Sequence, residues 1–294
     1  MTVKKIGVVG CGMMGAGIAQ VTAQRGFSTI VREVTPELLD KGMDKIRANM
    51  VKAVDNEQVT TEKMEQALEH LSGTVRLEDL ADCDLVIEAI VEDADEKREL
   101  FLSLDDICGE NTLFATNTSS LTVTDLAAAT GRPDRMLGLH FFNPVPRMKL
   151  VEIVRSLQTS EETFRVARDF VERLEKQPIV CKDTSGFVVN RLLVPYLLDA
   201  VRALEHNLAG IRDIDTGMEL GCGYPMGPLK LLDFVGLDTT VHIANIMFEE
   251  FRETRFAPPP LLKKMVRAGM LGRKSGQGFY DYSGTPPEPS EFHV

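Results

Sequence analysis

Long apolar runs, paired cysteines and an excess of basic residues are all missing from this 294-residue chain. No run approaches the length needed to span a membrane, and a strand-like segment lies close to the N-terminus, where a signal peptide would otherwise stand. The five cysteines are scattered without a CxxC pair, which is typical of reduced thiols in a cytosol. We therefore expect a cytoplasmic protein.

The charge balance excludes one class of partner. At pH 7 the formal net charge is −11, because 44 acidic side chains outnumber 33 basic ones. Such a chain repels nucleic acid and anionic membranes, so neither is expected to bind. A polyanionic ligand would need a local cluster of basic residues. The length suits two domains, and no internal repeat or low-complexity segment is found.

A short apolar segment at 5–9 runs directly into a glycine-rich turn, Gly10-x-Gly12-x-x-Gly15. Gly10 allows a tight turn, Gly12 leaves room for a pyrophosphate, and Gly15 lets the next helix pack closely. The phosphates would lie at a helix N-terminus, whose free N–H groups favour an anion. A turn without a ligand is the alternative. The loop residues expected to contact a cofactor are Gly10, Cys11, Gly12, Met13, Met14 and Gly15.

A second strand, at 27–32, ends at the acidic residue Glu33. Dinucleotide-binding folds carry an acid about 20 residues after the loop, where it holds the ribose 2′-hydroxyl. An acid there repels a 2′-phosphate, so NAD is predicted in preference to NADP, although the neighbouring Arg32 weakens that preference. No metal is expected.

Strand-like and helical segments alternate up to about residue 180, the pattern of a parallel sheet flanked by helices. Beyond 186 the pattern is helical, without convincing strand pairs. We predict an α/β fold: a doubly wound, mostly parallel Rossmann-type sheet in residues 1–183, then an all-helical C-terminal domain in 184–294. The expected strands lie at 84–89, 112–117, 136–141, 150–154 and 178–181, and the expected helices at 36–54, 61–71, 161–175 and 188–208.

His140 and Glu152 are the candidates for proton transfer. His140 ends a predicted central strand, and that end faces the ligand crevice in open α/β sheets. Glu152 lies in an apolar run, where a carboxylate is costly to bury without a partner. A neutral imidazole paired with it would gain a fixed tautomer and basicity. The residues alone leave a structural histidine, and an ion pair of Glu152 with a basic neighbour such as Arg155, as alternatives.

Polar residues follow another buried strand at Asn117-Thr118-Ser119-Ser120. Their hydroxyl and amide groups suit a substrate oxygen or the nicotinamide ribose, but the same sequence is a good helix N-cap. Asn190, at the start of the first C-terminal helix, alone predicts only a cap or a hydrogen bond at a domain interface.

Taken in order, these motifs resemble the L-3-hydroxyacyl-CoA dehydrogenase family, particularly bacterial 3-hydroxybutyryl-CoA dehydrogenases, over essentially the whole chain. The resemblance implies reversible NAD-dependent oxidation of short-chain (S)-3-hydroxyacyl-CoA, such as 3-hydroxybutyryl-CoA, to 3-ketoacyl-CoA. It also implies a homodimer formed by the helical domain, which would close over the substrate. The segments that carry the resemblance, besides the glycine loop, are 84–89, 117–121, 138–144, 186–191, 224–228 and 272–280.

The resemblance also implies roles for single residues. His140 would remove the hydroxyl proton, Glu152 would orient His140, and Ser119 and Asn190 would hold the substrate's 3-oxygen. The implied cofactor contacts outside the loop are Glu33, Glu92, Lys97, Ser119, Asn143 and Lys274.

The predicted CoA contacts depart from the family pattern. Relatives can use a serine and a lysine on the helix after the second strand, where this chain has Asn49 and Asn56. Lys41, Lys45 and Lys52 keep one side of that helix basic, and a solvated face is as well supported as a CoA contact. The acyl-CoA contacts that we predict are Ser119, Asn49 and Lys52.

Three questions stay open at this point. A sugar-acid dehydrogenase of the L-gulonate type, with the same fold, is one alternative function, and a non-catalytic NAD-binding protein is another. Cys11 occupies a variable position of the loop. A thiol at a helix N-terminus tends to have a lowered pKa, which suggests that its alkylation blocks NAD binding. The plainer interpretation is a small residue that fits.

Overall fold

A computed structural model describes residues 2–291 and divides the chain into two compact units, the first ending at Phe187 and the second beginning at Val188. The roles of the two predicted domains stay predictions. Among the described residues no single helix is long and apolar enough to span a membrane. Within the same part of the chain, only two successive helices, α9 (Pro228–Val235) and α10 (Leu237–Phe251), reach that length together, with a bend of 94° between them.

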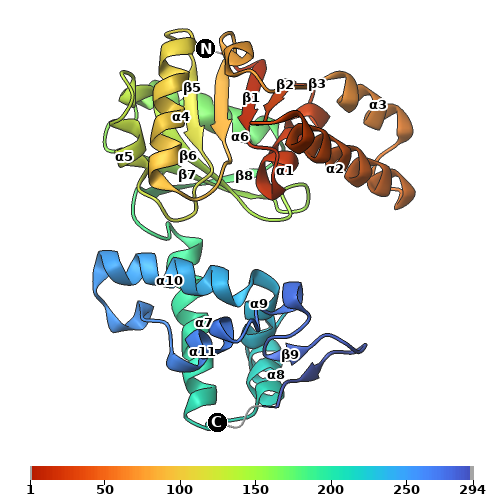
Figure 1. Ribbon diagram of the computed structural model, residues 1–294, viewed down its shortest axis with the longest axis vertical. Coiled ribbons are helices and arrows are strands. Elements are labelled where there is room, and N and C mark those ends of the chain that lie inside the picture. The colour runs from red at the N-terminus through yellow and green to blue at the C-terminus, as the bar shows by residue number, and fades with distance from the viewer. Residues whose placement is uncertain (1, 292–294) are drawn as a thin grey trace. The chain divides into compact units, whose positions relative to one another are not determined.

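The first unit is built on an eight-stranded sheet in the order β3-β2-β1-β4-β5-β6-β7-β8 (Figure 1). Its pairs are parallel except β6 with β7. The first six strands have the order of dinucleotide-binding folds, whose ligand lies where the order reverses, beside β1 and β4. The predicted Rossmann-type sheet is confirmed. The strands are β1 (Lys5–Val9), β2 (Ser28–Arg32), β3 (Leu71–Thr74), β4 (Leu85–Glu88), β5 (Leu113–Thr116), β6 (Met136–Phe141), β7 (Leu150–Arg155) and β8 (Gln177–Lys182).

Helices cover both faces of this sheet, so its strands are apolar on both sides. On one face Phe27 packs edge-on against Phe170 of α6, and on the other Phe101 of α4 packs against Phe114. The helices of the first unit are α1 (Met13–Gln24), α2 (Pro36–Asp55), α3 (Thr61–Glu69), α4 (Ala94–Ile107), α5 (Val123–Ala127) and α6 (Glu161–Arg173), with 3₁₀ turns η1 (Leu77–Leu80) and η2 (Pro133–Arg135).

The sequence pattern missed β3. The helix expected to run to 71 ends at Glu69, and Leu71–Thr74 instead pairs in parallel with β2. A four-residue strand that contains a glycine has little local preference for extended structure. Its conformation is fixed by the neighbouring strand and by the buried side chain of Leu71, neither of which is visible in a short sequence window.

The second unit is helical, as predicted, but near its end it also contains a two-stranded antiparallel pair that the sequence pattern did not predict. Its core contains Leu198, Leu232 and Met247 from three different helices. The elements are α7 (Val189–Glu205), α8 (Ile211–Cys222), α9 (Pro228–Val235), α10 (Leu237–Phe251), η3 (Thr254–Phe256), α11 (Pro260–Arg267), η4 (Arg273–Ser275), β9 (Tyr280–Asp281) and β10 (Glu288–Pro289).

A buried carboxylate fastens that pair to the helices. Asp233 of α9 accepts backbone N–H groups of Phe279 and Tyr280, each at 2.8 Å, and the hydroxyl of Tyr282 at 3.1 Å. Burial raises the pKa of Asp233 to about 6 despite these donors. The segment therefore folds because a polar group of the core satisfies its backbone.

Candidate active site

The glycine loop has the shape that a dinucleotide requires. Gly10 has φ +94°, a region that favours glycine. A Cβ on Gly15 would lie 1.8 Å from the carbonyl oxygen of Gly10, so only glycine allows α1 to start this close to β1. A Cβ on Gly12 would meet nothing within 4 Å, and that side of the loop is open. The residues present fit a pyrophosphate at the N-terminus of α1.

Glu33 is bound to the same loop. Its Oε1 accepts the N–H of Cys11 at 2.5 Å, and its Oε2 accepts the N–H of Val34 at 3.1 Å. These two hydrogen bonds fix the side chain. Because each carboxylate oxygen has a second lone pair, it can still accept a ribose hydroxyl. The backbone therefore holds the predicted ribose acid in place.

The environment of the Cys11 thiol disfavours its reactive thiolate form. The residue is buried, and a Cβ on Gly42 of α2 would lie 2.3 Å from its Sγ. Burial, and secondly the charge of Glu33, raise the pKa of Cys11 to about 11. The lowered pKa suggested by its place before α1 is therefore wrong, because desolvation against α2 outweighs the effect of the helix terminus. Cys11 is the small residue that fits against Gly42.

His140 and Glu152 form a buried pair. They lie directly opposite each other in the antiparallel pairing of β6 with β7, and His140 Nδ1 is 2.6 Å from Glu152 Oε2. The glutamate side chain is fully buried, and that of the histidine is 8% exposed. Arg155, the alternative partner, forms an ion pair with Glu161 at 2.6 Å. With Glu152 ionised the proton lies on Nδ1, which leaves Nε2 as a proton acceptor.

Two aromatic rings flank the imidazole. The centroid of the Phe142 ring is 4.5 Å from that of His140, and the centroid of Phe187 is 5.6 Å away. Both contacts restrict the ring to the orientation that bonds Glu152. Phe187 was not among the residues selected from the sequence.

A buried cation joins the ends of β4 and β5. Lys97, with a side chain 1% exposed, places Nζ 2.5 Å from Glu88 Oε1 and 3.1 Å from Glu92 Oε2. Glu88 also accepts the hydroxyl of Thr116 at 2.6 Å. Burial disfavours the charge of Glu92, but Lys97 and Thr118 outweigh it, so its pKa is lowered. The two carboxylates thus balance the charge of Lys97 within the protein. Glu88 belongs to this network and was not selected as a site residue from the sequence.

The Ser119 segment rests on this network. Glu92 Oε1 accepts the N–H of Ser119 at 3.1 Å and the hydroxyl of Ser120 at 3.0 Å, and the hydroxyl of Thr118 bonds the same oxygen. Asn117 Oδ1 accepts the N–H of Phe141, next to His140, at 2.9 Å. The carboxyl ends of β4, β5 and β6 are therefore tied together. The helix N-cap expected in this segment is wrong, because α5 begins only at Val123, after Thr122, and Thr118 instead accepts the N–H of Leu121 at 2.9 Å in the turn before that helix.

The remaining candidates are more exposed. Asn143, before a cis Asn143–Pro144 bond, lies in the exposed turn after β6. Lys274, in the second unit, donates to Asp238 at 2.7 Å, and Asn190 is half-buried in the first turn of α7. The side chains of α2 predicted to face CoA, Asn49 and Lys52, are exposed. Their roles stay predictions.

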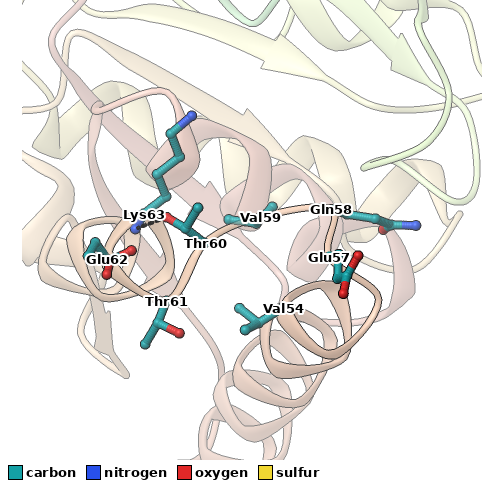
Figure 2. A pocket seen from close by; sticks show the side chains of 8 residues that line it. All are labelled: Val54, Glu57, Gln58, Val59, Thr60, Thr61, Glu62 and Lys63. Atoms are coloured by element: carbon teal, nitrogen blue, oxygen red, sulfur yellow. Dashed lines mark hydrogen bonds between the residues drawn. The ribbon is translucent and has the colours of Figure 1, made fainter.

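A hollow of about 440 Å³ lies at the turn between α2 and α3, away from the strand ends (Figure 2). None of the candidate residues lines it. The Thr60 side chain accepts the N–H of Lys63 and caps α3, so this polar group serves the start of the helix. The lining residues are Val54, Glu57, Gln58, Val59, Thr60, Thr61, Glu62 and Lys63. We assign this hollow no ligand.

The chain matches the models of one protein family over most of its length. Residues 5–184 match the model of the 3-hydroxyacyl-CoA dehydrogenase NAD-binding domain, and residues 186–282 match that of the 3-hydroxyacyl-CoA dehydrogenase C-terminal domain. The chain belongs to the 3-hydroxyacyl-CoA dehydrogenase family. It is an NAD-dependent oxidoreductase, and the cofactor and family expected from the sequence are confirmed.

Relatives in this family match the chain over almost its full length. A 3-hydroxybutyryl-CoA dehydrogenase from Mycobacterium tuberculosis is 48% identical over 95% of this chain and 99% of its own. The mitochondrial hydroxyacyl-coenzyme A dehydrogenase of Sus scrofa is 47% identical over 95% and 91%. The crystal structure of (S)-3-hydroxybutyryl-CoA dehydrogenase from Ralstonia eutropha, 41% identical, superposes with a TM-score of 0.93 over 96% of this chain and 100% of that one.

Proposed function

We propose that this family member catalyses the reversible, NAD-dependent oxidation of short-chain (S)-3-hydroxyacyl-CoA, such as 3-hydroxybutyryl-CoA, to the 3-ketoacyl-CoA. The observation that carries the proposal is the buried contact of His140 with Glu152 at the sheet edge that also bears the glycine loop. The substrate class is supported by the names of relatives that cover nearly the whole chain.

His140 acts as the general base in this proposal. Glu152 accepts a hydrogen bond from Nδ1–H, fixes the tautomer and stabilises the imidazolium that forms when Nε2 takes the substrate's hydroxyl proton. When bound, NAD supplies the acceptor for the hydride that leaves C3. In the reverse direction the imidazolium returns the proton to the 3-oxygen. The aromatic rings of Phe142 and Phe187 lie against the imidazole, whose side chain is 8% exposed, and this limits the access of water to the base.

Other residues bind and orient the ligands. Ser119, held by its backbone to Glu92, is placed to hold the 3-oxygen or the cofactor, and family resemblance adds Asn190, Asn143 and Lys274. Glu33 takes the adenosine ribose. Lys97 acts through Glu92 in this scheme, because its own ammonium is buried between two carboxylates.

A spectrophotometric assay tests the function. We expect the purified protein to consume NADH, followed by its absorbance, when acetoacetyl-CoA is added, and to form no NADH from L-gulonate and NAD. A series of 3-ketoacyl-CoA substrates from C4 to C16 then measures chain-length preference. Turnover of L-gulonate without turnover of acetoacetyl-CoA would replace our proposal with the sugar-acid alternative.

The basic side of α2 is proposed to attract the CoA nucleotide. Lys41, Lys45 and Lys52 are exposed within one helix on a chain of net charge −11, and Asn49 lies beside them. We expect the triple variant Lys41→Ala, Lys45→Ala, Lys52→Ala to raise KM for acetoacetyl-CoA by roughly tenfold, with KM for NADH unchanged. Equal changes in both constants would mean that the face is only solvated.

We also propose a homodimer formed through the second unit. Leu220 of α8 is 82% exposed, and a Cβ on Gly217 or Gly221 of the same helix would meet nothing within 4 Å. An exposed leucine between small residues suits close contact with a second copy of this helix. Sedimentation equilibrium tests this proposal: a homodimer gives twice the chain mass of 32.6 kDa, and a mass of 32.6 kDa would contradict it.

A further inference from the structure

The last five residues of the first unit, 183–187, form a turn that several hydrogen bonds hold in place next to His140 and Glu152. Both oxygens of Asp183 accept backbone N–H groups at the start of α5, from Val123 at 2.9 Å and from Thr124 at 2.6 Å. Gly186 then turns the chain with φ +80°, and the N–H of Phe187 bonds the carbonyl of Thr184 at 2.9 Å. These bonds fix where the ring of Phe187 enters the first unit.

The conformation of Phe187 is unusual for a bulky residue. Its φ is +44°, a region that side chains with a Cβ rarely adopt. Four other non-glycine residues between 2 and 291 have positive φ, and all four are exposed. Phe187 is 3% exposed and packs with Val123 and Val154. Glycine would adopt this backbone conformation with less strain, so the contacts of the Phe187 ring must offset that strain.

The ring of Phe187 reaches the catalytic histidine. It lies 5.6 Å from the imidazole centroid at an angle of 58°, while Phe142 contacts the imidazole at 4.5 Å. Glu152 binds only Nδ1 among the ring atoms and does not fix the tilt of the ring by itself. A second and a third contact are needed to aim Nε2.

We propose that Phe187 is a positioning residue of the dehydrogenase: its ring holds the His140 imidazole in the orientation that aims Nε2 at the substrate hydroxyl. The proposal rests on the function proposed for His140. Phe187 touches no reacting atom in this scheme and acts only through His140. A misaligned base lowers the rate of proton transfer without weakening substrate binding.

Phe187→Leu tests this role, because leucine keeps an apolar side chain at the same φ but removes the ring. We expect kcat with acetoacetyl-CoA to fall by roughly 10- to 100-fold, with KM for acetoacetyl-CoA and Kd for NADH changed by less than about twofold. Imidazole ¹⁵N shifts, assigned to His140 by their loss in His140→Gln, should stay those of the Nδ1–H tautomer, because Glu152 still fixes it. The loss of kcat then reflects the aim of Nε2 and not its protonation; a change of tautomer would contradict this role for the ring. If Phe187→Leu does not fold, Phe187→Met is measured by the same criteria.

Val154→Ala is the matched control, since it loosens the same apolar cluster from the strand that carries Glu152. We expect it to lower stability but to keep kcat within about twofold of the parent. Unchanged kcat in Phe187→Leu, or an equal loss in Val154→Ala, would overturn the proposal. If His140→Gln retains full activity, the proposed function fails instead; if His140→Gln is inactive and Phe187→Leu is fully active, only this inference fails.

Discussion

His140→Gln is expected to lower kcat with acetoacetyl-CoA by about 10³-fold, a loss of about 4 kcal/mol in transition-state stabilisation. Glutamine keeps a planar polar group that can still donate to Glu152, but its amide takes no proton at neutral pH. The glycine loop and Glu33 are unaffected, so the Kd for NADH should stay within about twofold. Steady-state kinetics and NADH fluorescence titration measure the two quantities.

His70→Gln is the control for this experiment, because His70 is an exposed residue at the end of α3. We expect it to behave as the parent protein. Full activity in His140→Gln would show that another group transfers the proton. Loss of NADH binding together with turnover would show that the substitution disturbs the cofactor site rather than the base.

Gly12→Ala and Gly15→Ala should separate two reasons for glycine in one loop. A Cβ on Gly12 meets nothing within 4 Å, so this variant should fold as the parent does and bind NADH roughly 100-fold more weakly, a loss of about 2.7 kcal/mol. A Cβ on Gly15 would lie 1.8 Å from the Gly10 carbonyl. That variant should lose both NADH binding and about 3 kcal/mol of folding free energy or more, since backbone must move.

Chemical denaturation and NADH titration measure both effects. Gly109→Ala is the matched control, because a Cβ there has no neighbour closer than 4.0 Å and the residue lies in the turn before β5. It should leave both quantities nearly unchanged. Normal NADH binding by Gly12→Ala would mean that the pyrophosphate does not approach the loop at this residue.

Local patterns predicted most of the sheet and the NAD cofactor correctly, while the contacts of the glycine loop and of Glu33 with that cofactor stay predictions. The glycine spacing, Glu33 and the buried apolar segments depend on neighbouring residues only, so they can be recognised in a short window. β3 and the β9–β10 pair were missed for the opposite reason. Their strands hold only four and two residues, and pairing partners rather than propensity make them extended.

The buried pair of His140 and Glu152 shows where the sequence is ambiguous. His140 and Glu152 are 12 residues apart, and nothing local shows that β7 runs antiparallel to β6 or which residues face each other. A register shifted by one residue would have placed Glu152 on the other face of the sheet. From the sequence, a basic neighbour such as Arg155, Arg147 or Lys149 was an alternative partner of Glu152 with nearly as much support; in the structure Arg155 pairs with Glu161.

The sequence by itself determined the fold class and the glycine-loop motif, because both depend on spacing along the chain, and it indicated the family through the resemblance of several motifs taken in order. Only the tertiary structure decided the environment of single side chains. It buried Cys11 against Gly42 and raised its pKa, placed Lys97 between Glu88 and Glu92, and brought Phe187 to His140. Desolvation, charge pairing and ring contacts depend on residues distant in sequence, so they exist only once the chain has folded.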